Sequence, residues 1–255
     1  LEYYEHRTYL PIMGLLMIVA LINDQLKWGY KLRLGLSVGI IVIFTFMASV
    51  HSDNFKDSVA FFSNATERGN PGASVNRGEY YMEQRDFSNA IKDFNLAIKL
   101  SRGEYAPAFY NRGVYYSQVA KDHSAAEADF SRTIALDPSY IDAYIKRASE
   151  RVFSSNFEGA LNDLDRAKNI DSMRVDIYYT QAKVFTGAMI FKESLPFYDK
   201  AISMYGYSAE MYNDRAYVKY RIKDYEGALQ DCEKAISLMP NLMSAYYNKG
   251  IIYLE

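Results

Sequence analysis

Small residues recur along most of this chain at a nearly constant spacing. Ala148, Ala182, Ala216 and Gly250 follow one another at intervals of 34 residues, and Gly78 and Gly113 continue the series upstream with a step of 35. Two further series keep this period: Ala90, Ala126, Ala160, Ser194 and Ala228, and then Ala97, Thr133, Ala167, Ala201 and Ala235. Three series with one period are typical of a solenoid, in which each unit packs only on its neighbours. The sequence therefore predicts a stack of repeated units.

Each repeat has the pattern of two helices joined by a short turn, which we call helix A and helix B. Small residues let two helix axes approach closely, and larger side chains fill the space around them. The large positions of helix B are Phe94, Phe130, Leu164, Tyr198 and Cys232. The turns between the helices carry Asp or Asn before an aromatic residue, as in Asp86-Phe87, Asn156-Phe157 and Asp224-Tyr225. Asp and Asn suit helix N-caps, so we expect an all-α fold of helix pairs.

At these residues, and at Pro138 and Pro240 just beyond helix B, the chain resembles the tetratricopeptide repeat family. The resemblance covers about residues 71–255, with five full repeats and the start of a sixth, and it implies a right-handed superhelical solenoid. The second repeat has one extra residue within 120–124, which we expect to bulge its inter-helix turn. Because the chain stops within helix A of the sixth repeat and does not begin with Met, we expect it to be an excerpt.

The first 52 residues differ from the rest in their hydropathy. Two runs, about residues 8–23 and 34–50, contain no charged side chain. A membrane-spanning helix needs about 20 apolar residues, with a lower limit near 17. We therefore expect a two-helix transmembrane hairpin over residues 1–52, with a buried helical hairpin in a soluble protein as the alternative.

The basic residues around these runs predict the orientation of the hairpin. Lys27, Lys31 and Arg33 lie between the two runs, whereas Arg7 and Lys56 lie on the outer flanks. The positive-inside rule then places the loop in the cytoplasm. We expect an integral membrane protein whose repeats lie on the non-cytoplasmic side, in the periplasm or the ER lumen.

Residues 53–70 have the pattern of a lone helix B followed by a connector. Phe62 and Ala65 have the same spacing as Phe94 and Ala97 of the first full repeat. We expect this half-repeat helix to cover the first repeat and to join it to the membrane hairpin.

A second resemblance concerns the segment Glu5-His6-Arg7-Thr8-Tyr9-Leu10-Pro11 and the order of elements up to about residue 110. It is similar to the last membrane spans of C-type, protein O-mannosyltransferase-like glycosyltransferases, many of which carry C-terminal tetratricopeptide repeats. In such enzymes the acceptor and the lipid-linked sugar meet on the non-cytoplasmic face, where the charge bias places Glu5 and Arg7, and the resemblance implies that Arg7 contacts a lipid phosphate. The alternative is that Glu5, His6 and Arg7 form an interfacial anchor or pair with a loop outside this sequence. The acidic catalytic residues of that family lie in earlier loops, so we do not expect this segment to be an enzyme.

Other chemistry has little support in the sequence. His6, His51 and His123 have no Cys or His neighbours at metal-ligand spacing, and we expect neither a metal nor a cofactor. The net charge of −2 disfavours a nucleic-acid partner. Asp recurs before the large residue of helix B, at Asp93, Asp129, Asp163 and Asp231. We expect these four carboxylates to be solvated.

A peptide or protein ligand is the partner that the repeats favour, bound in a groove lined by helices A. The resemblance to the repeat family places these residues in the groove: Asn76, Glu79, Tyr110, Asn111, Lys146, Tyr179, Lys183, Asn213, Tyr217 and Arg221. Asn76, Asn111 and Lys146 partly resemble the carboxylate clamp of chaperone-binding tetratricopeptide domains. The clamp is incomplete, because its leading basic residue would fall near Gly72 and its later partner is Asp142.

Three functions follow from these observations. The first is a membrane-anchored scaffold for protein–protein interaction. The second is the C-terminal, acceptor-presenting part of a multi-spanning glycosyltransferase in protein O-glycosylation. The third is a soluble adaptor or co-chaperone. The partner, the organism and the oligomeric state do not follow from the sequence.

Overall fold

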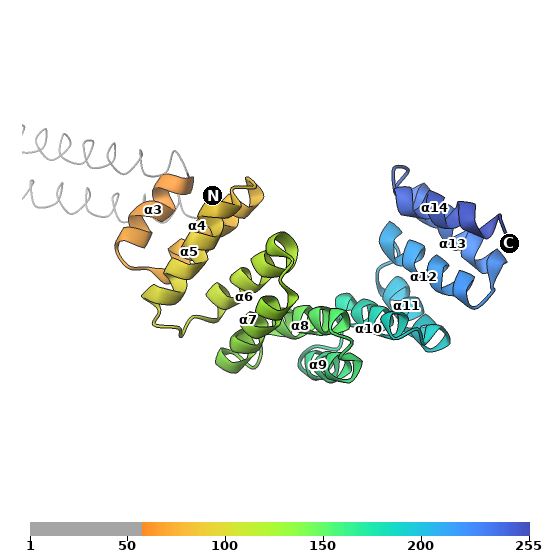
Figure 1. The fold of residues 1–255 in the computed structure, drawn as a ribbon, viewed down its shortest axis with the longest axis horizontal. Helices are drawn as coiled ribbons and strands as arrows, with labels where there is room; N and C mark the ends of the chain where they lie inside the picture. The colour runs from red at the N-terminus through yellow and green to blue at the C-terminus, as the bar shows by residue number, and fades with distance from the viewer. Residues whose placement is uncertain (1–57) are drawn as a thin grey trace, which may run out of the picture. The chain divides into compact units, whose positions relative to one another are not determined.

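The computed structural model describes residues 58–255, and within this range the secondary structure is entirely helical (Figure 1). Helix α3 (Ser58–Glu67) comes first. The helices A are α4 (Pro71–Glu83), α6 (Ala106–Tyr115), α8 (Ile141–Phe153), α10 (Val175–Gly187), α12 (Ala209–Arg221) and α14 (Met243–Ile252). The helices B are α5 (Phe87–Leu100), α7 (His123–Leu136), α9 (Phe157–Ile170), α11 (Phe191–Met204) and α13 (Tyr225–Leu238). Units 1 to 5 are the pairs from α4–α5 to α12–α13.

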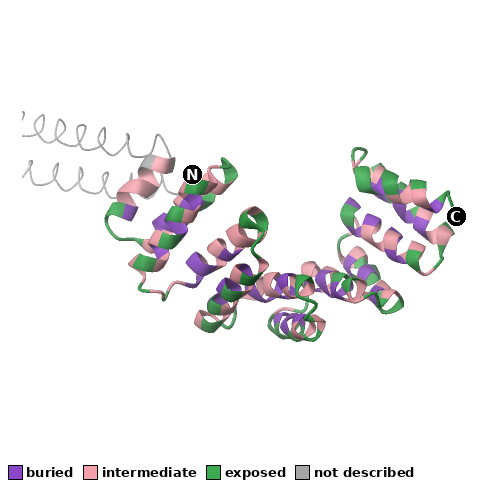
Figure 2. Ribbon diagram, in the orientation of Figure 1, coloured by how far each residue is buried: buried purple, intermediate pink, exposed green. Residues whose placement is uncertain are grey.

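Residues 62–255 form one compact body in which each helix packs on its sequence neighbours. The most extensive contacts join helix A to helix B within a unit, and helix B then packs on helix A of the next unit. Buried and exposed residues alternate along each helix, as the colours of the ribbon show (Figure 2). The expectation of an all-helical, solenoid-like stack is confirmed for these residues.

The small residues of helix B lie in the closest contacts of this stack. Both helix-B series are completely buried, and the large residues between them are at most 1% exposed. In helix A, a Cβ added at Gly78 would lie 2.5 Å from Cε1 of Phe94, and one added at Gly113 would lie 2.8 Å from Cε1 of Phe130. The two glycines therefore admit the aromatic rings of helix B, which fixes how closely the two helices approach.

The turns between helices A and B repeat one local structure. Asp86, Asp122, Asn156 and Asp224 each accept a hydrogen bond on the side chain from the backbone N–H three residues later. The expected N-caps are therefore present. The residue before each cap has a positive φ, although none of these residues is glycine. In unit 4 the cap position is Ile190, which provides no side-chain hydrogen bond.

The extra residue of unit 2 lies earlier than expected. Helix α6 continues into a π-helical turn, η1 (Tyr116–Ala120), and Lys121 and the Asp122 cap then follow as in the other units. A π-helical turn holds one residue more than an α-helical turn. The helix thus absorbs the insertion, and the expected bulge of the inter-helix turn is wrong.

The recurrent aspartates are buried, and the expectation that they are solvated is wrong. Asp93, Asp129, Asp163 and Asp231 are between 3% and 6% exposed. Each accepts two hydrogen bonds from one arginine of its own helix A, at 2.6–2.9 Å; these arginines are Arg77, Arg112, Arg147 and Arg215. We call these the intra-unit arginines. A bidentate guanidinium compensates a buried carboxylate for its lost hydration.

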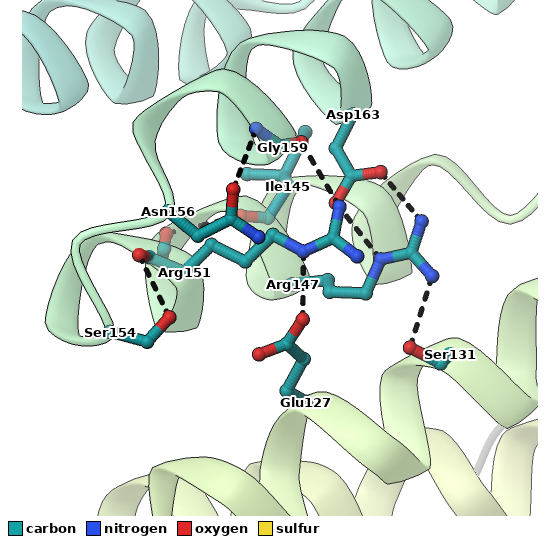
Figure 3. Close-up of polar contacts among 10 residues, drawn as sticks. Glu127, Ser131, Ile145, Arg147, Arg151, Ser154, Asn156, Gly159 and Asp163 are labelled. Carbon is teal, nitrogen blue, oxygen red and sulfur yellow. Dashed lines mark hydrogen bonds and ion pairs between the residues drawn. The ribbon is translucent and has the colours of Figure 1, made fainter.

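The same arginines also join neighbouring units. The remaining guanidinium nitrogen, Nη1, donates to the preceding helix B, to Ser63, Asn95, Ser131 and Asp199 in turn. In unit 3, Arg151 adds a second cation to Asp163 and reaches Glu127 of α7 (Figure 3). Each intra-unit arginine therefore connects three helices.

Several sequence expectations lie outside the described residues. These are the transmembrane hairpin, its orientation, and the roles of Glu5 and Arg7. None of the helices within 58–255 has the length and hydropathy needed to cross a bilayer.

Candidate binding face

The ten residues predicted for the groove lie on helices A of five successive units, and we call them the helix-A face. Asn76, Glu79, Lys183 and Arg221 are exposed, and Tyr110, Asn111, Lys146, Tyr179 and Tyr217 are half-buried. Asn213 is the exception, because it is only 8% exposed. Its side-chain oxygen accepts from Nδ2 of Asn248 in α14 at 2.9 Å, so Asn213 holds two helices A together.

At the N-terminal end of the face, units 1 and 2 are joined by a side-chain hydrogen bond. Nδ2 of Asn111 donates to Oε1 of Glu79 at 2.9 Å and to the backbone oxygen of Pro107 at 3.1 Å. Desolvation raises the pKa of the Glu79 carboxyl, and the bond from Asn111 acts in the opposite direction. Because the Asn111 amide donates within the chain, it is not free to grip a ligand carboxylate as a clamp residue would.

In the middle of the face, an arginine that was not predicted from the sequence forms ion pairs with two helices A. Arg174 lies just before α10 and pairs with Asp142 of α8 and with Asp176 of α10. The sequence pattern that could have predicted these ion pairs is a basic residue just before a helix A, together with an acid at the second position of that helix and of the preceding helix A. Asp142, which breaks the carboxylate-clamp pattern, is therefore part of an inter-unit ion pair.

Aromatic rings form the apolar part of the face. Tyr110 lies with its ring centroid 4.9 Å from that of Tyr140 and 5.8 Å from that of Phe130. The hydroxyl of Tyr179 donates to Oδ2 of Asp214 in the next helix A at 2.7 Å. Burial is the main cause that raises the pKa of both the Tyr110 and the Tyr179 phenol. Both phenols are therefore protonated at neutral pH, and the single hydroxyl hydrogen of Tyr179 is donated to Asp214.

The C-terminal part of the face carries two cations that lie on aromatic rings. Nζ of Lys183 is 5.4 Å from the ring centroid of Tyr179. Cζ of Arg221 is 4.3 Å from the ring centroid of Phe191, and its Nη1 donates to the hydroxyl of Tyr217. We call Tyr179, Lys183, Phe191, Tyr217 and Arg221 the cation–aromatic cluster. Phe191, at the start of helix B, was not predicted for this face.

The described part of the chain shows no cluster of metal ligands and no exposed thiol. Within residues 58–255, His, Cys, Asp and Glu side chains nowhere gather in groups of three or more that could hold a metal ion. Cys232 is buried, and burial raises the pKa of its thiol to about 11. Cys232 is completely buried at the helix-B position that the repeat pattern predicts for the core.

Comparison with known proteins identifies the repeat. The sequence model for the tetratricopeptide repeat matches residues 72–104 and 209–242. These segments are tetratricopeptide repeats. Mouse serine/threonine-protein phosphatase 5 is 34% identical over 85 residues, which are 33% of this chain and 17% of that protein. The chain therefore spans only a small part of that relative's length.

Solved structures extend the likeness to most of the chain. The crystal structure of YrrB, described as a TPR protein with an unusual peptide-binding site, has a TM-score of 0.56 and 18% identity, and the match covers 74% of this chain and 97% of that one. TTC0263 of Thermus thermophilus, a thermophilic TPR protein, has a TM-score of 0.62 and 14% identity over 72% of this chain and all of that one. At these identities the likeness shows the fold.

Proposed function

We propose that this chain is a scaffold for protein–protein interaction that binds a peptide or protein on the helix-A face. The observation that carries the proposal is the row of half-buried tyrosines Tyr110, Tyr179 and Tyr217, which lie on three of the helices A. Tyrosine offers a rigid apolar ring and a polar tip, and it is enriched in binding interfaces.

The hydrogen bonds between successive helices A hold this face in place before any ligand arrives. They include Asn111 to Glu79, Tyr179 to Asp214, and Asn248 to Asn213. A surface that is ordered in advance loses less conformational entropy on binding. The peptide-binding site in the description of YrrB belongs to that protein, and it supports the proposal by analogy of fold.

The test is selection of binding peptides followed by substitution of the face. Peptides selected from a random display library on the full chain should bind the wild type. They should lose at least about tenfold in affinity with Tyr179→Ala and Tyr217→Ala, or with Asn111→Ala and Lys146→Ala. The matched control is Lys192→Ala and Lys234→Ala on the helices B of units 4 and 5. Peptides that distinguish only the helix-B variant from the wild type would contradict the proposal.

We also propose that residues 1–52 anchor the scaffold in a membrane, with the repeats on the non-cytoplasmic side. The support is the pair of uncharged runs and the basic loop between them. We assign residues 53–70 to a half-repeat and connector, in keeping with the bond from Arg77 to Ser63 of α3 at 2.7 Å. Extraction of cell membranes with alkaline carbonate should leave the chain in the pellet. Labelling of Ser203→Cys in sealed membrane vesicles by an impermeant maleimide should distinguish the two sides, with buried Cys232 as the unlabelled background.

A further inference from the structure

The two basic side chains of the cation–aromatic cluster, Lys183 and Arg221, differ from the intra-unit arginines in their partners. The intra-unit arginines all contact a carboxylate at 2.6–2.9 Å. Lys183 and Arg221, in contrast, make no ion pair with any of the described residues, and both are exposed. Asp214, an acid on α12, accepts from Tyr179 and from Asn213.

The aromatic rings hold these two cations in a defined direction. The guanidinium of Arg221 lies over Phe191 and is fixed at one nitrogen by the Tyr217 hydroxyl. A ring face contacts the flat side of a guanidinium and leaves the N–H groups on its edge free. Arg221 therefore presents unused donors to solvent, in the arrangement that a carboxylate accepts as a bidentate pair.

Lys183 and Arg221 lie on adjacent helices A and one helical turn apart in the repeat. Tyr217 is the counterpart of Lys183, at an interval of 34 residues, and Arg221 follows Tyr217 by four residues. The 2.7 Å hydrogen bond from Tyr179 to Asp214 joins these two helices. One helical turn, about 5.4 Å, separates the positions of Lys183 and Arg221 along the helix direction.

We infer that the cation–aromatic cluster binds an acidic segment of a partner protein, with carboxylates on Lys183 and Arg221 and its backbone or side chains against Tyr179 and Tyr217. The inference rests on the proposed function of the helix-A face and adds the chemical class of its ligand. The charge of the cluster favours an acidic segment over a basic or a neutral one.

Fluorescence anisotropy with a fluorescein-labelled hexaglutamate peptide tests the inference on the full chain. Hexaglutamate should bind, and its affinity should fall as the salt concentration rises from about 50 to about 300 mM. Hexalysine and hexaglutamine should not bind. Lys183→Met with Arg221→Met should raise Kd by at least about tenfold. The control Lys192→Met with Lys234→Met removes the same charge from helices B of the same units, and it should leave Kd within about twofold.

Four results would overturn the inference. Hexaglutamate binding that survives Lys183→Met with Arg221→Met places the site elsewhere. Equal loss in the helix-B control makes the effect one of net charge. Equal binding of a ten-nucleotide oligouridylate, with the same loss in the variant, makes the cluster a general polyanion surface. If display-selected neutral peptides bind and depend on Tyr179 and Tyr217 while hexaglutamate does not bind, the ligand class is wrong and the proposed function still holds.

Discussion

The intra-unit arginines and the cations of the cation–aromatic cluster differ in their partners and in their exposure to solvent. Arg112, in unit 2, contacts the buried Asp129 through two nitrogens and reaches α5 through a third. Arg221, in unit 5, has an aromatic ring on one side, one tyrosine hydroxyl bond, and solvent on its remaining edge. The same residue type therefore joins the helices of the stack at one position and remains exposed to solvent at another.

Unit 4 shows what happens when the intra-unit pair is absent. Gln181 replaces the arginine and Phe197 replaces the aspartate, and the ring of Phe197 stacks on that of Phe185 at 5.2 Å. Gln181 is 5% exposed, and its Oε1 has no hydrogen-bond partner among residues 58–255. An unpartnered buried amide costs stability, so aromatic packing replaces the ion pair incompletely.

The largest expected effect comes from an intra-unit arginine. Arg112→Met leaves the carboxylate of Asp129 buried without its cation, and we expect a loss of about 3 kcal/mol in the free energy of unfolding. Arg221→Met, its matched control on the helix-A face, should cost less than about 1 kcal/mol. Unfolding in guanidinium chloride, monitored by circular dichroism, measures the free energy of unfolding of both variants. Equal losses of unfolding free energy in the two variants would contradict the difference between the intra-unit arginines and the cations of the helix-A face.

The next effect concerns the glycines of helix A. Gly78→Ala places a Cβ against the ring of Phe94 and should destabilise the chain by about 1–3 kcal/mol. Gly250→Ala is the matched control, because a Cβ there meets no atom within 4 Å. In that helix, alanine should stabilise by about 0.5–1 kcal/mol. Thermal unfolding of the two variants should shift in opposite directions, and a shift in the same direction would contradict the proposed contact.

A smaller effect is expected at the missing cap of unit 4. Ile190→Asp would supply the side-chain oxygen that Asp224 supplies in unit 5, and it should stabilise by about 1 kcal/mol. Ile190→Ala is the control, because it removes the exposed isoleucine without adding a cap. If both variants unfold at the same denaturant concentration, the cap has no effect in this turn.

The smallest change is expected at Gln181. Gln181→Met removes the unpartnered amide while keeping the volume, so it should be neutral or stabilise by up to about 1 kcal/mol. The same substitution at the equivalent Arg112 should be strongly destabilising, as above. A marked loss in Gln181→Met would indicate that the amide has a partner, such as an ordered water.

The sequence predicted the fold because the small residues that set helix contacts recur with the period of the units. It also located the caps at Asp86, Asn156 and Asp224, since N-caps depend on residues three positions apart. The intra-unit pairs were missed because Arg112 and Asp129 lie 17 residues apart on different helices, and each alone resembles a surface charge. The π-helical turn was missed because periodicity shows that unit 2 has an extra residue but not which turn absorbs it.

The helix-A face was predicted only in part, because some of its features depend on contacts between units. Periodicity placed Tyr110, Lys183 and Tyr217 on helices A, whereas the burial of Asn213 and the stacking of Arg221 on Phe191 depend on contacts between units. Such contacts join residues about one repeat apart, and helical periodicity within one element does not specify them.

We propose that stability and binding depend on different cations of the same stack. Unfolding in guanidinium chloride and hexaglutamate binding can be measured on the same preparations of Arg112→Met and of Lys183→Met with Arg221→Met. We expect Arg112→Met to unfold at a lower denaturant concentration and to bind like the wild type under native conditions, whereas the double variant should unfold almost like the wild type and lose binding. A double variant that loses stability and binding together, or binds as well as the wild type, would contradict it.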